Sequence, residues 1–92
     1  MYYIYVLQSI KDNKLYSGYT DNLRRRLEDH NKGKVESTKF RRPFKLIYYE
    51  AYLHQQDATV REKYFKTQWG RNHLRKTLKN YWAVSSAGRA FH

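Results

Sequence analysis

Five side chains that can take part in acid–base and phosphate chemistry are spread over the first two thirds of the chain. They are two tyrosines, an arginine, a histidine and a glutamate: Tyr5, Tyr16, Arg26, His30 and Glu62. The planar fork of an arginine matches the oxygens of a phosphate, and a histidine titrates near neutral pH. A tyrosine hydroxyl can hold a water molecule, but a pKa of about 10 makes it a poor base unless a cation, such as Mg²⁺ or an arginine, lowers that value. The set suits chemistry on a phosphate, provided that the fold brings its members together.

The N-terminal residues predict a β-hairpin that brings the two tyrosines together. Residues 2–9 are rich in β-branched and aromatic side chains, and residues 14–19 form a second such run after the turn signal at 12–13. An even number of loop residues places Tyr5 and Tyr16 on the same face of the hairpin, because side chains alternate along a strand. The two rings are then diagonal neighbours, close enough to act on one ligand.

A helix is expected next, over residues 20–32, and it presents one arginine and the histidine to the hairpin. Thr20 or Asp21 supplies the side chain that caps its first turn. Three arginines follow one another in this helix, and helical spacing directs only the last, Arg26, toward the apolar face. His30 lies one turn further on the same side. Arg26 could bind phosphate and His30 could orient water, although each also suits an ordinary boundary position.

The rest of the chain predicts a loop, a strand and two helices. Residues 34–43 are polar and basic, and residues 44–53 are apolar on both faces, as in a strand covered on both sides. Residues 58–69 and 71–82 have helical periodicity, and Gly70 is expected to stop the first of these helices. The expected fold class is therefore α/β: a small three-stranded, mainly antiparallel sheet flanked by helices.

Glu62 is the sharpest irregularity in the sequence, because it interrupts an apolar helix face. The helix, capped by Asp57, is expected to bury a stripe made of Ala58, Phe65 and Trp69, and Glu62 falls in the middle of that stripe. A carboxylate there is costly unless it is paired or bound to a metal. One interpretation is a ligand for a divalent metal, since Mg²⁺ takes one or two carboxylates with waters and phosphate oxygens. The other is a structural ion pair with an inward arginine, or a hydrogen bond to a tyrosine.

The composition excludes several classes of site and of protein. The 92 residues suffice for one domain, expected over residues 1–82 and followed by a disordered tail over 83–92. Cysteine is absent, which excludes disulfides, thiolate metal sites and cysteine nucleophiles. No apolar run approaches the length of a membrane span and the N-terminal residues lack the pattern of a signal peptide, so a cytoplasmic protein is expected.

The net charge of +11, from 19 Lys and Arg against 8 Asp and Glu, predicts attraction to nucleic acid. A membrane surface is the weaker alternative, because the basic segments lack a strongly apolar opposite face. Basic side chains of the loop and of the last helix are expected to contact phosphates, although solvated surface charge would give the same pattern. These side chains are Lys34, Lys39, Arg41, Arg42, Arg71, Arg75 and Lys76.

The order and spacing of the five reactive residues resemble the GIY-YIG endonuclease family. Residues 3–5 (Tyr-Ile-Tyr) correspond to its first motif and residues 16–18 (Tyr-Ser-Gly) to its second, one on each strand of the hairpin. The arginine of the family lands on Arg26, and the histidine or tyrosine that follows it lands on His30. The resemblance covers roughly residues 1–81. It is nearest to the small stand-alone members, which are similar to the N-terminal nuclease domain of the bacterial excision-repair endonuclease.

The resemblance implies hydrolysis of phosphodiester bonds in DNA by one divalent metal, Mg²⁺ or Mn²⁺, held by Glu62. Arg26 would stabilise the phosphoryl oxygens. Tyr5 would position the attacking water, with Tyr16 and His30 assisting, and which tyrosine acts as the base stays open. The strand order 2-1-3 and a role in DNA repair or recombination also follow from the resemblance. A chain this short leaves no room for a separate specificity domain, so selection by DNA structure, or weak selection by sequence, is expected.

Two departures from the motifs keep other functions open. Tyr3 stands in place of the first glycine, and Ser17 occupies the middle of the second motif. The principal alternative is a non-catalytic module on the same fold that binds DNA or RNA. A further alternative is a protein-interaction module that needs a partner, which predicts weak affinity for DNA despite the charge.

Overall fold

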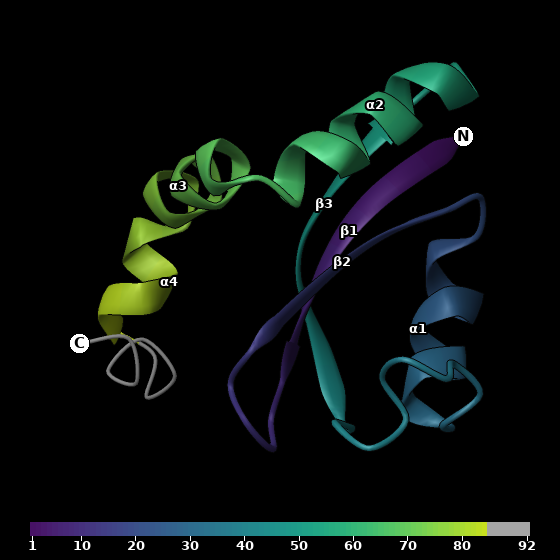
Figure 1. The fold of residues 1–92 in the computed structure, drawn as a ribbon, viewed down its shortest axis with the longest axis vertical. Coiled ribbons are helices and arrows are strands. Elements are labelled where there is room, and N and C mark those ends of the chain that lie inside the picture. Colours follow the sequence, from purple (N-terminus) through teal and green to yellow (C-terminus); the bar gives the residue numbers. More distant parts are fainter. Residues whose placement is uncertain (85–92) are drawn as a thin grey trace.

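The computed structural model describes residues 1–84 and contains a three-stranded antiparallel sheet in the order β2-β1-β3 (Figure 1). Its strands are β1 (Tyr2–Ser9), β2 (Leu15–Thr20) and β3 (Phe44–Tyr52). The hairpin register pairs Tyr5 with Gly18 and Leu7 with Tyr16, as an even-numbered loop requires. The α/β class and the strand order expected from the sequence are both confirmed.

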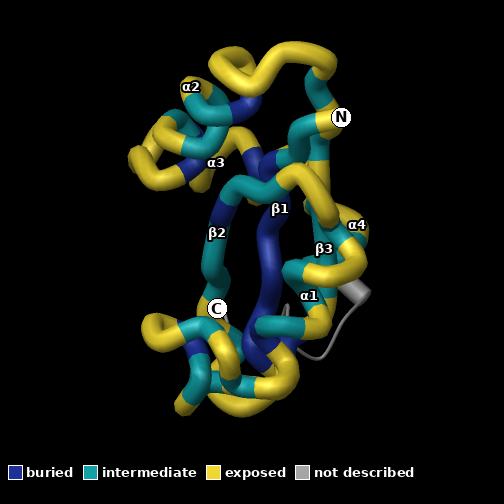
Figure 2. The backbone as a smooth tube through the Cα atoms, turned by 90° about the vertical axis from the view of Figure 1, so that its right-hand side faces the viewer, coloured by how far each residue is buried: buried dark blue, intermediate teal, exposed yellow. Residues whose placement is uncertain are grey.

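Helices cover both faces of this sheet (Figure 1). They are α1 (Leu23–Asn31), α2 (Gln55–Phe65), α3 (Gln68–Thr77) and α4 (Lys79–Val84). On one face, Leu23 and Leu27 of α1 pack against Tyr5 of β1, whereas Ile4 of β1 shares a second core with Leu74 of α3. Because β1 contributes alternate side chains to two cores, it is buried along most of its length (Figure 2).

The helix expected over residues 58–69 is two helices that meet at a sharp turn. The first begins earlier, where His54 caps it, and Asp57 lies inside the first turn instead of at the cap. The second begins after Thr67, whose side chain accepts a hydrogen bond from the backbone N–H of Gly70 at 3.2 Å. A threonine cap after the helix end is therefore the signal that separates α2 from α3.

Gly70, expected to end a helix, lies within α3 because α3 crosses the end of α2 closely. A Cβ at this position would overlap the backbone of Tyr64 and Phe65, so the approach requires glycine. The same turn directs Trp69 outward, where its side chain is 78% exposed instead of buried in the apolar stripe. Ala58 and Phe65 are buried as expected.

The first helix begins later than expected. Asn22 caps α1, and its side chain accepts a hydrogen bond from the backbone N–H of Arg25 at 3.1 Å. Thr20 instead accepts from the backbone N–H of Asn22 at 3.1 Å, which fixes the turn that leads into the helix. Neither Thr20 nor Asp21 is the cap, because β2 continues through Thr20.

The helix expected over residues 71–82 is interrupted near Leu78, where α3 ends and α4 begins. Tyr81 of α4 donates a hydrogen bond of 2.5 Å to the side-chain oxygen of Gln8 on β1, which ties α4 to the central strand. Helix α4 includes the first two residues of the tail expected over 83–92. The rest of that tail lies outside the described residues.

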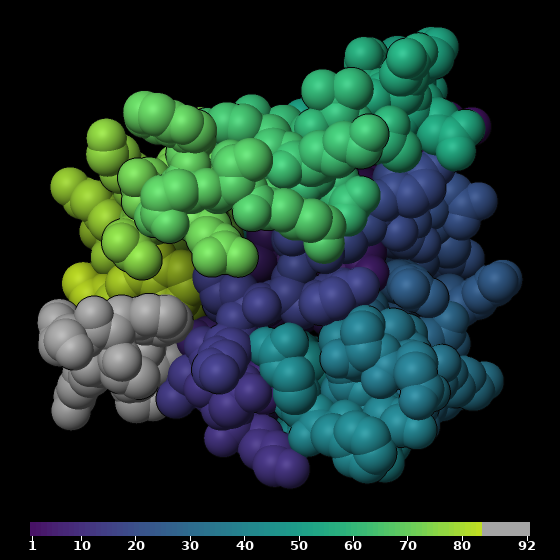
Figure 3. Space-filling model, in the orientation of Figure 1, coloured from purple at the N-terminus to yellow at the C-terminus, as the bar shows by residue number. Residues whose placement is uncertain are grey.

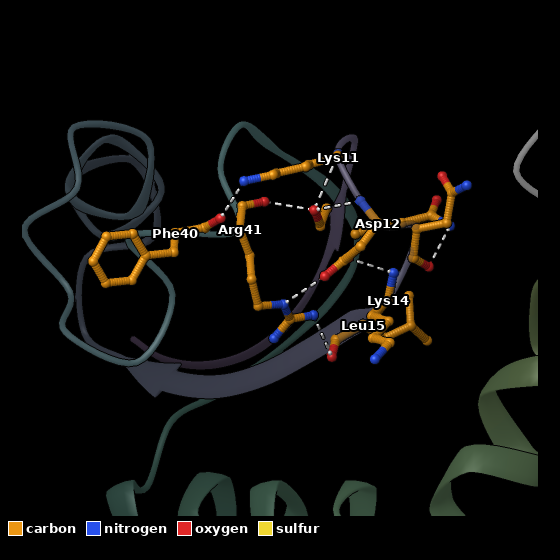
Figure 4. Close-up of polar contacts among 9 residues, drawn as sticks. Lys11, Asp12, Lys14, Leu15, Phe40 and Arg41 are labelled. Atoms are coloured by element: carbon orange, nitrogen blue, oxygen red, sulfur yellow. Dashed lines mark hydrogen bonds and ion pairs between the residues drawn. The ribbon is translucent and has the colours of Figure 1, made fainter.

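The basic loop over residues 34–43 is fastened to the tip of the hairpin (Figure 4). Ser9 donates a hydrogen bond of 2.5 Å to the carbonyl oxygen of Arg41, and Arg41 donates from Nε to Asp12 at 3.2 Å. These contacts hold the loop against the sheet beside α1. Within residues 1–84, no helix has the length and apolar character needed to cross a membrane.

Candidate active site

A chain of hydrogen bonds links β1, α1 and the loop that follows α1. The hydroxyl of Tyr5 lies 2.9 Å from Nε2 of His30, and Arg26 donates from Nε to the same hydroxyl at 3.3 Å. On the other side of the imidazole, Nδ1 of His30 lies 2.7 Å from Oγ1 of Thr38. Tyr5 is 1% exposed and His30 and Thr38 are fully enclosed. These hydrogen bonds are therefore already formed in the folded protein before any ligand binds.

The partners of Thr38 give this chain a direction. The Thr38 hydroxyl lies 3.5 Å from the carbonyl oxygen of Val35, to which it can donate. It then accepts from the Nδ1–H of His30, and the unprotonated Nε2 accepts from the hydroxyl of Tyr5. The Tyr5 oxygen in turn accepts from Arg26. This direction satisfies both polar atoms of a neutral imidazole.

Burial sets the ionisation of this chain. It lowers the pKa of His30 to about 4, and the positive charge of Arg26 acts in the same direction. Burial also raises the pKa of Tyr5, although the hydrogen bond and the charge of Arg26 oppose the change. The expectation that an arginine lowers the pKa of an active-site tyrosine therefore has the right sign for Arg26, but burial outweighs it. At neutral pH, His30 is a neutral imidazole and Tyr5 a neutral hydroxyl.

Tyr16 stands beside this chain and is partly exposed, unlike Tyr5. Its ring centroid is 6.4 Å from that of Tyr5 and 5.0 Å from that of His30. Gly18, the pairing partner of Tyr5, leaves the space that the Tyr5 hydroxyl fills, because an added Cβ would overlap that hydroxyl. Tyr3, which departs from the first motif, packs edge-on against Tyr49 of β3.

Glu62 reaches the opposite flank of β2 from helix α2. Its Oε2 lies 3.3 Å from Nζ of Lys66, one helical turn later. The same Nζ donates to the carbonyl oxygen of Ser17 at 3.0 Å and lies 5.5 Å from the ring centroid of Tyr16. Tyr16 therefore borders both groups: the hydrogen-bonded chain on the α1 side and the carboxylate on the α2 side.

The position of Glu62 corrects the expectation of a carboxylate inside the apolar stripe. Its side chain is 23% exposed, at the margin of the stripe, because α2 overhangs the edge strand β2 and one flank of the helix meets solvent. Its ion-pair partner is Lys66, not an inward arginine. After burial and the charge of Tyr16, the charge of Glu62 also helps to raise the pKa of Tyr5. The carboxylate is thus electrostatically coupled to the chain across the strand.

The basic residues expected to contact phosphates differ in their exposure and in whether they already form ion pairs within the protein. Lys39 and Arg41 of the loop each pair with an acidic side chain, at 3.1 and 3.2 Å. Lys34 and Arg42 are exposed. On α3, Arg71 and Arg75 line a hollow beside β2, whereas Lys76 is exposed and does not line it.

Two residues of the site escape sequence reasoning. Thr38 lies in the polar loop, and nothing in the sequence around it distinguishes it from a surface threonine. Lys66 does carry a signal, since it follows Glu62 at the spacing at which side chains meet on a helix. Its contact with Ser17, however, depends on how α2 lies over β2.

Comparisons with known proteins agree with this geometry. Residues 1–78 match the model of the GIY-YIG catalytic domain. A UPF0213 protein of Pediococcus pentosaceus is 45% identical over 80 residues, which are 86% of this chain and 83% of that protein. A UPF0213 protein of Clostridium perfringens is 42% identical over 67 residues, 72% of this chain and 71% of its own.

A solved structure shares the fold. The solution NMR structure of a UPF0213 protein from Bacillus halodurans superposes with a TM-score of 0.52 at 31% sequence identity, over 84% of this chain and 85% of that one. With the hairpin motifs, Arg26 and His30 joined in one site, and with Glu62 across the strand from them, the chain belongs to the GIY-YIG family of nuclease domains, which act on DNA.

Proposed function

We propose that this chain is a divalent-metal-dependent endonuclease that hydrolyses phosphodiester bonds in DNA. It would act in the cytoplasm on branched or duplex DNA during repair or recombination, selecting its target by structure more than by sequence. The observation that carries the proposal is the meeting of two groups at β2. These are Tyr5, Arg26 and His30 on one flank and Glu62 on the other, with Tyr16 between them.

The donor set at Glu62 fits a magnesium or manganese ion. Within residues 1–84, no three acidic or histidine side chains gather as a metal site, so the protein would supply one carboxylate. Its Oε1 accepts no hydrogen bond from the described residues. Mg²⁺ takes one or two carboxylates and completes its shell with waters and phosphate oxygens. When bound, the ion would stabilise the charge on the phosphate and on the leaving oxygen.

The different exposure of the two tyrosines divides their roles. Tyr16 is partly exposed, and we assign to it the contact with the attacking water. Tyr5 is enclosed and hydrogen-bonded to Arg26 and His30, so it acts as a positioning residue and not as the water-binding group expected from the sequence. The remaining N–H groups of Arg26 would bind the phosphoryl oxygens.

The test compares the wild type with Glu62→Gln on labelled flapped, branched and fully paired DNA, in Mg²⁺, in Mn²⁺ and in EDTA. We expect metal-dependent cutting by the wild type alone, with DNA binding retained by both proteins. Glu36→Gln is the matched control, since it removes the same charge from an exposed loop position. Cutting by Glu62→Gln at the wild-type rate would contradict the role of Glu62.

The same assay separates the two alternative functions. DNA binding by both proteins without cutting of any substrate would favour a non-catalytic DNA- or RNA-binding module. Weak binding at low salt would favour a module that needs a protein partner, since a net charge of +11 alone predicts salt-sensitive attraction to nucleic acid.

A further inference from the structure

A hollow of about 910 Å³ lies next to the site, between β2 and the helices α3 and α4. Tyr16, Ser17 and Lys66 are among the residues that line it, so the hollow borders the ion pair of Lys66 with Glu62. In Figure 3 the surface is recessed along the line where the green α3 region meets the blue β2 region. A volume of this size is at the upper end for sites that hold a small organic ligand.

The rim of this hollow is positively charged. The lining side chains that the structure describes include no acidic residue. Four of its basic side chains are exposed and have no carboxylate partner among the described residues, which contrasts with the internally paired Arg41 and Arg61. These four are Lys14, Arg71, Arg75 and Lys79.

The floor of the hollow is apolar. Phe65 and Leu74 are buried and contribute to it, together with the partly buried Leu15. An apolar floor beneath a cationic rim offers one surface for a flat base and another for the phosphates that flank it. A simple phosphate ion would not use the floor, and a paired base inside a duplex could not reach it.

We propose that this hollow binds unpaired nucleotides of the DNA, so that the nuclease takes substrates with a single-stranded segment beside the scissile bond. The inference rests on the proposed function for the identity of the polymer. The base would lie against Leu15 and Leu74, and the phosphates would meet Arg71 and Arg75. The hollow therefore supplies a physical reason for selection by DNA structure: paired nucleotides must leave the stack to enter it, whereas unpaired ones need not.

The binding test uses a splayed-arm DNA and a fully paired DNA of equal length, titrated in EDTA so that no cutting occurs. We expect wild type to bind the splayed-arm DNA more tightly, and the double variant Arg71→Gln/Arg75→Gln to lose that preference. For the splayed-arm DNA, the slope of log K against log salt should fall by about 1.4, twice the roughly 0.7 lost per single-strand phosphate contact.

The matched control is Lys63→Gln/Lys76→Gln, which removes the same charge from exposed positions of α2 and α3 outside the hollow. This control variant should bind both DNAs more weakly by the same factor and keep the preference for the splayed-arm DNA. Equal loss of preference in the two double variants, or no preference in the wild type, would overturn the inference.

A measurement on the wild type alone keeps the inference testable if the double variant does not fold. A 2-aminopurine base is placed in turn at each unpaired position of the arm and at paired positions as controls. We expect a change in emission on binding at the first unpaired positions only. Uniform changes along the arm would contradict the inference. Cutting of DNA without these changes in emission would refute the inference but support the proposed nuclease activity. The changes in emission without cutting would support the binding of unpaired nucleotides but contradict the nuclease activity.

Discussion

Two carboxylates on the α2 side of the sheet, Glu50 and Glu62, are similarly buried yet differ in their surroundings. Their side chains are 18% and 23% exposed. Glu50 accepts hydrogen bonds from the hydroxyls of Tyr48 and Tyr52, both at 2.5 Å, and from Arg61 at 2.9 and 3.2 Å. Glu62, the next residue after Arg61, has only the ion pair with Lys66 among the residues that the structure describes.

The hydrogen bonds of Glu50 mark it as a structural carboxylate, whereas Glu62 is available to a ligand. Burial by itself would raise the pKa of Glu50, but its hydrogen bonds with Arg61, Tyr48 and Tyr52 lower it overall. Every lone pair that faces the protein is used there. Lys66, the partner of Glu62, can be exchanged, because its side chain is half exposed and such an ion pair is worth little. The number of hydrogen bonds that the carboxylate accepts, more than its burial, distinguishes the structural role of Glu50 from the proposed ligand-binding role of Glu62.

The largest effect is expected for Glu62→Gln, which removes the available carboxylate. Cutting should fall by about a hundred- to a thousandfold, the range for loss of a group that stabilises transition-state charge. The free energy of unfolding should change by less than about 1 kcal/mol, because the ion pair that is lost has a half-exposed lysine. Single-turnover cleavage and urea unfolding of the same preparation measure both. A large loss of stability would show that Glu62 resembles Glu50 after all.

A second prediction concerns the buried imidazole of His30, whose two nitrogens both have hydrogen-bond partners. The folded-state pKa of His30 is about 4, below its usual value of about 6.5, so the unfolded state binds more protons between these values. Stability should be complete above about pH 6.5 and fall by up to about 3 kcal/mol as pH drops toward 4. Denaturant unfolding at a series of pH values measures this slope.

The control for that slope is His30→Gln, which cannot titrate in this range. Its stability should depend less on pH between about 6.5 and 4.5 than that of the wild type. Below that window Glu50, whose pKa is lowered, also begins to lose its contribution. Parallel curves for the two proteins above pH 4.5 would mean that the imidazole is accessible to protons in the folded state.

For Glu50→Gln we expect the opposite of the result for Glu62→Gln: a loss of stability without a loss of cutting. The variant leaves the Arg61 guanidinium without its charged partner, so the free energy of unfolding should fall by about 2 kcal/mol. Cutting by the folded fraction should not change, because Glu50 touches none of the reactive residues. Thermal unfolding, and cleavage measured well below the transition, test the two statements. A specific loss of cutting would remove the distinction between the two carboxylates.

The smallest effect is expected for Lys66→Gln. The free energy of unfolding should change by less than about 1 kcal/mol, since the Lys66 side chain is half exposed. Without the competing ammonium, the metal concentration for half-maximal cutting at saturating DNA should fall by roughly two- to fivefold. A metal titration with Lys63→Gln as control measures this. A requirement for more metal would instead mean that Lys66 helps to hold the carboxylate in place.

Part of this arrangement could be predicted from the sequence because it follows from local periodicity. Strand alternation brings Tyr5 and Tyr16 to one face, and helical spacing separates Arg26 from the arginines before it. The break between α2 and α3 could not be predicted as readily, because it depends on the close approach that Gly70 permits. Thr38 had no signal at all, since its role depends on how the loop after α1 folds back against His30.

The hydrogen bond between Tyr81 and Gln8 decides where this domain can be divided. The segment that matches the family model ends at residue 78, and it carries all five reactive side chains. Gln8 is 1% exposed, and its side-chain oxygen accepts from a hydroxyl three residues beyond that segment. A gene fusion that transplanted only residues 1–78 would carry the whole chemistry but leave an unpaired amide oxygen in the central strand. A segment that is to be transferred intact must therefore extend beyond the residues matched by the family model, at least to Tyr81, which takes no part in the reaction.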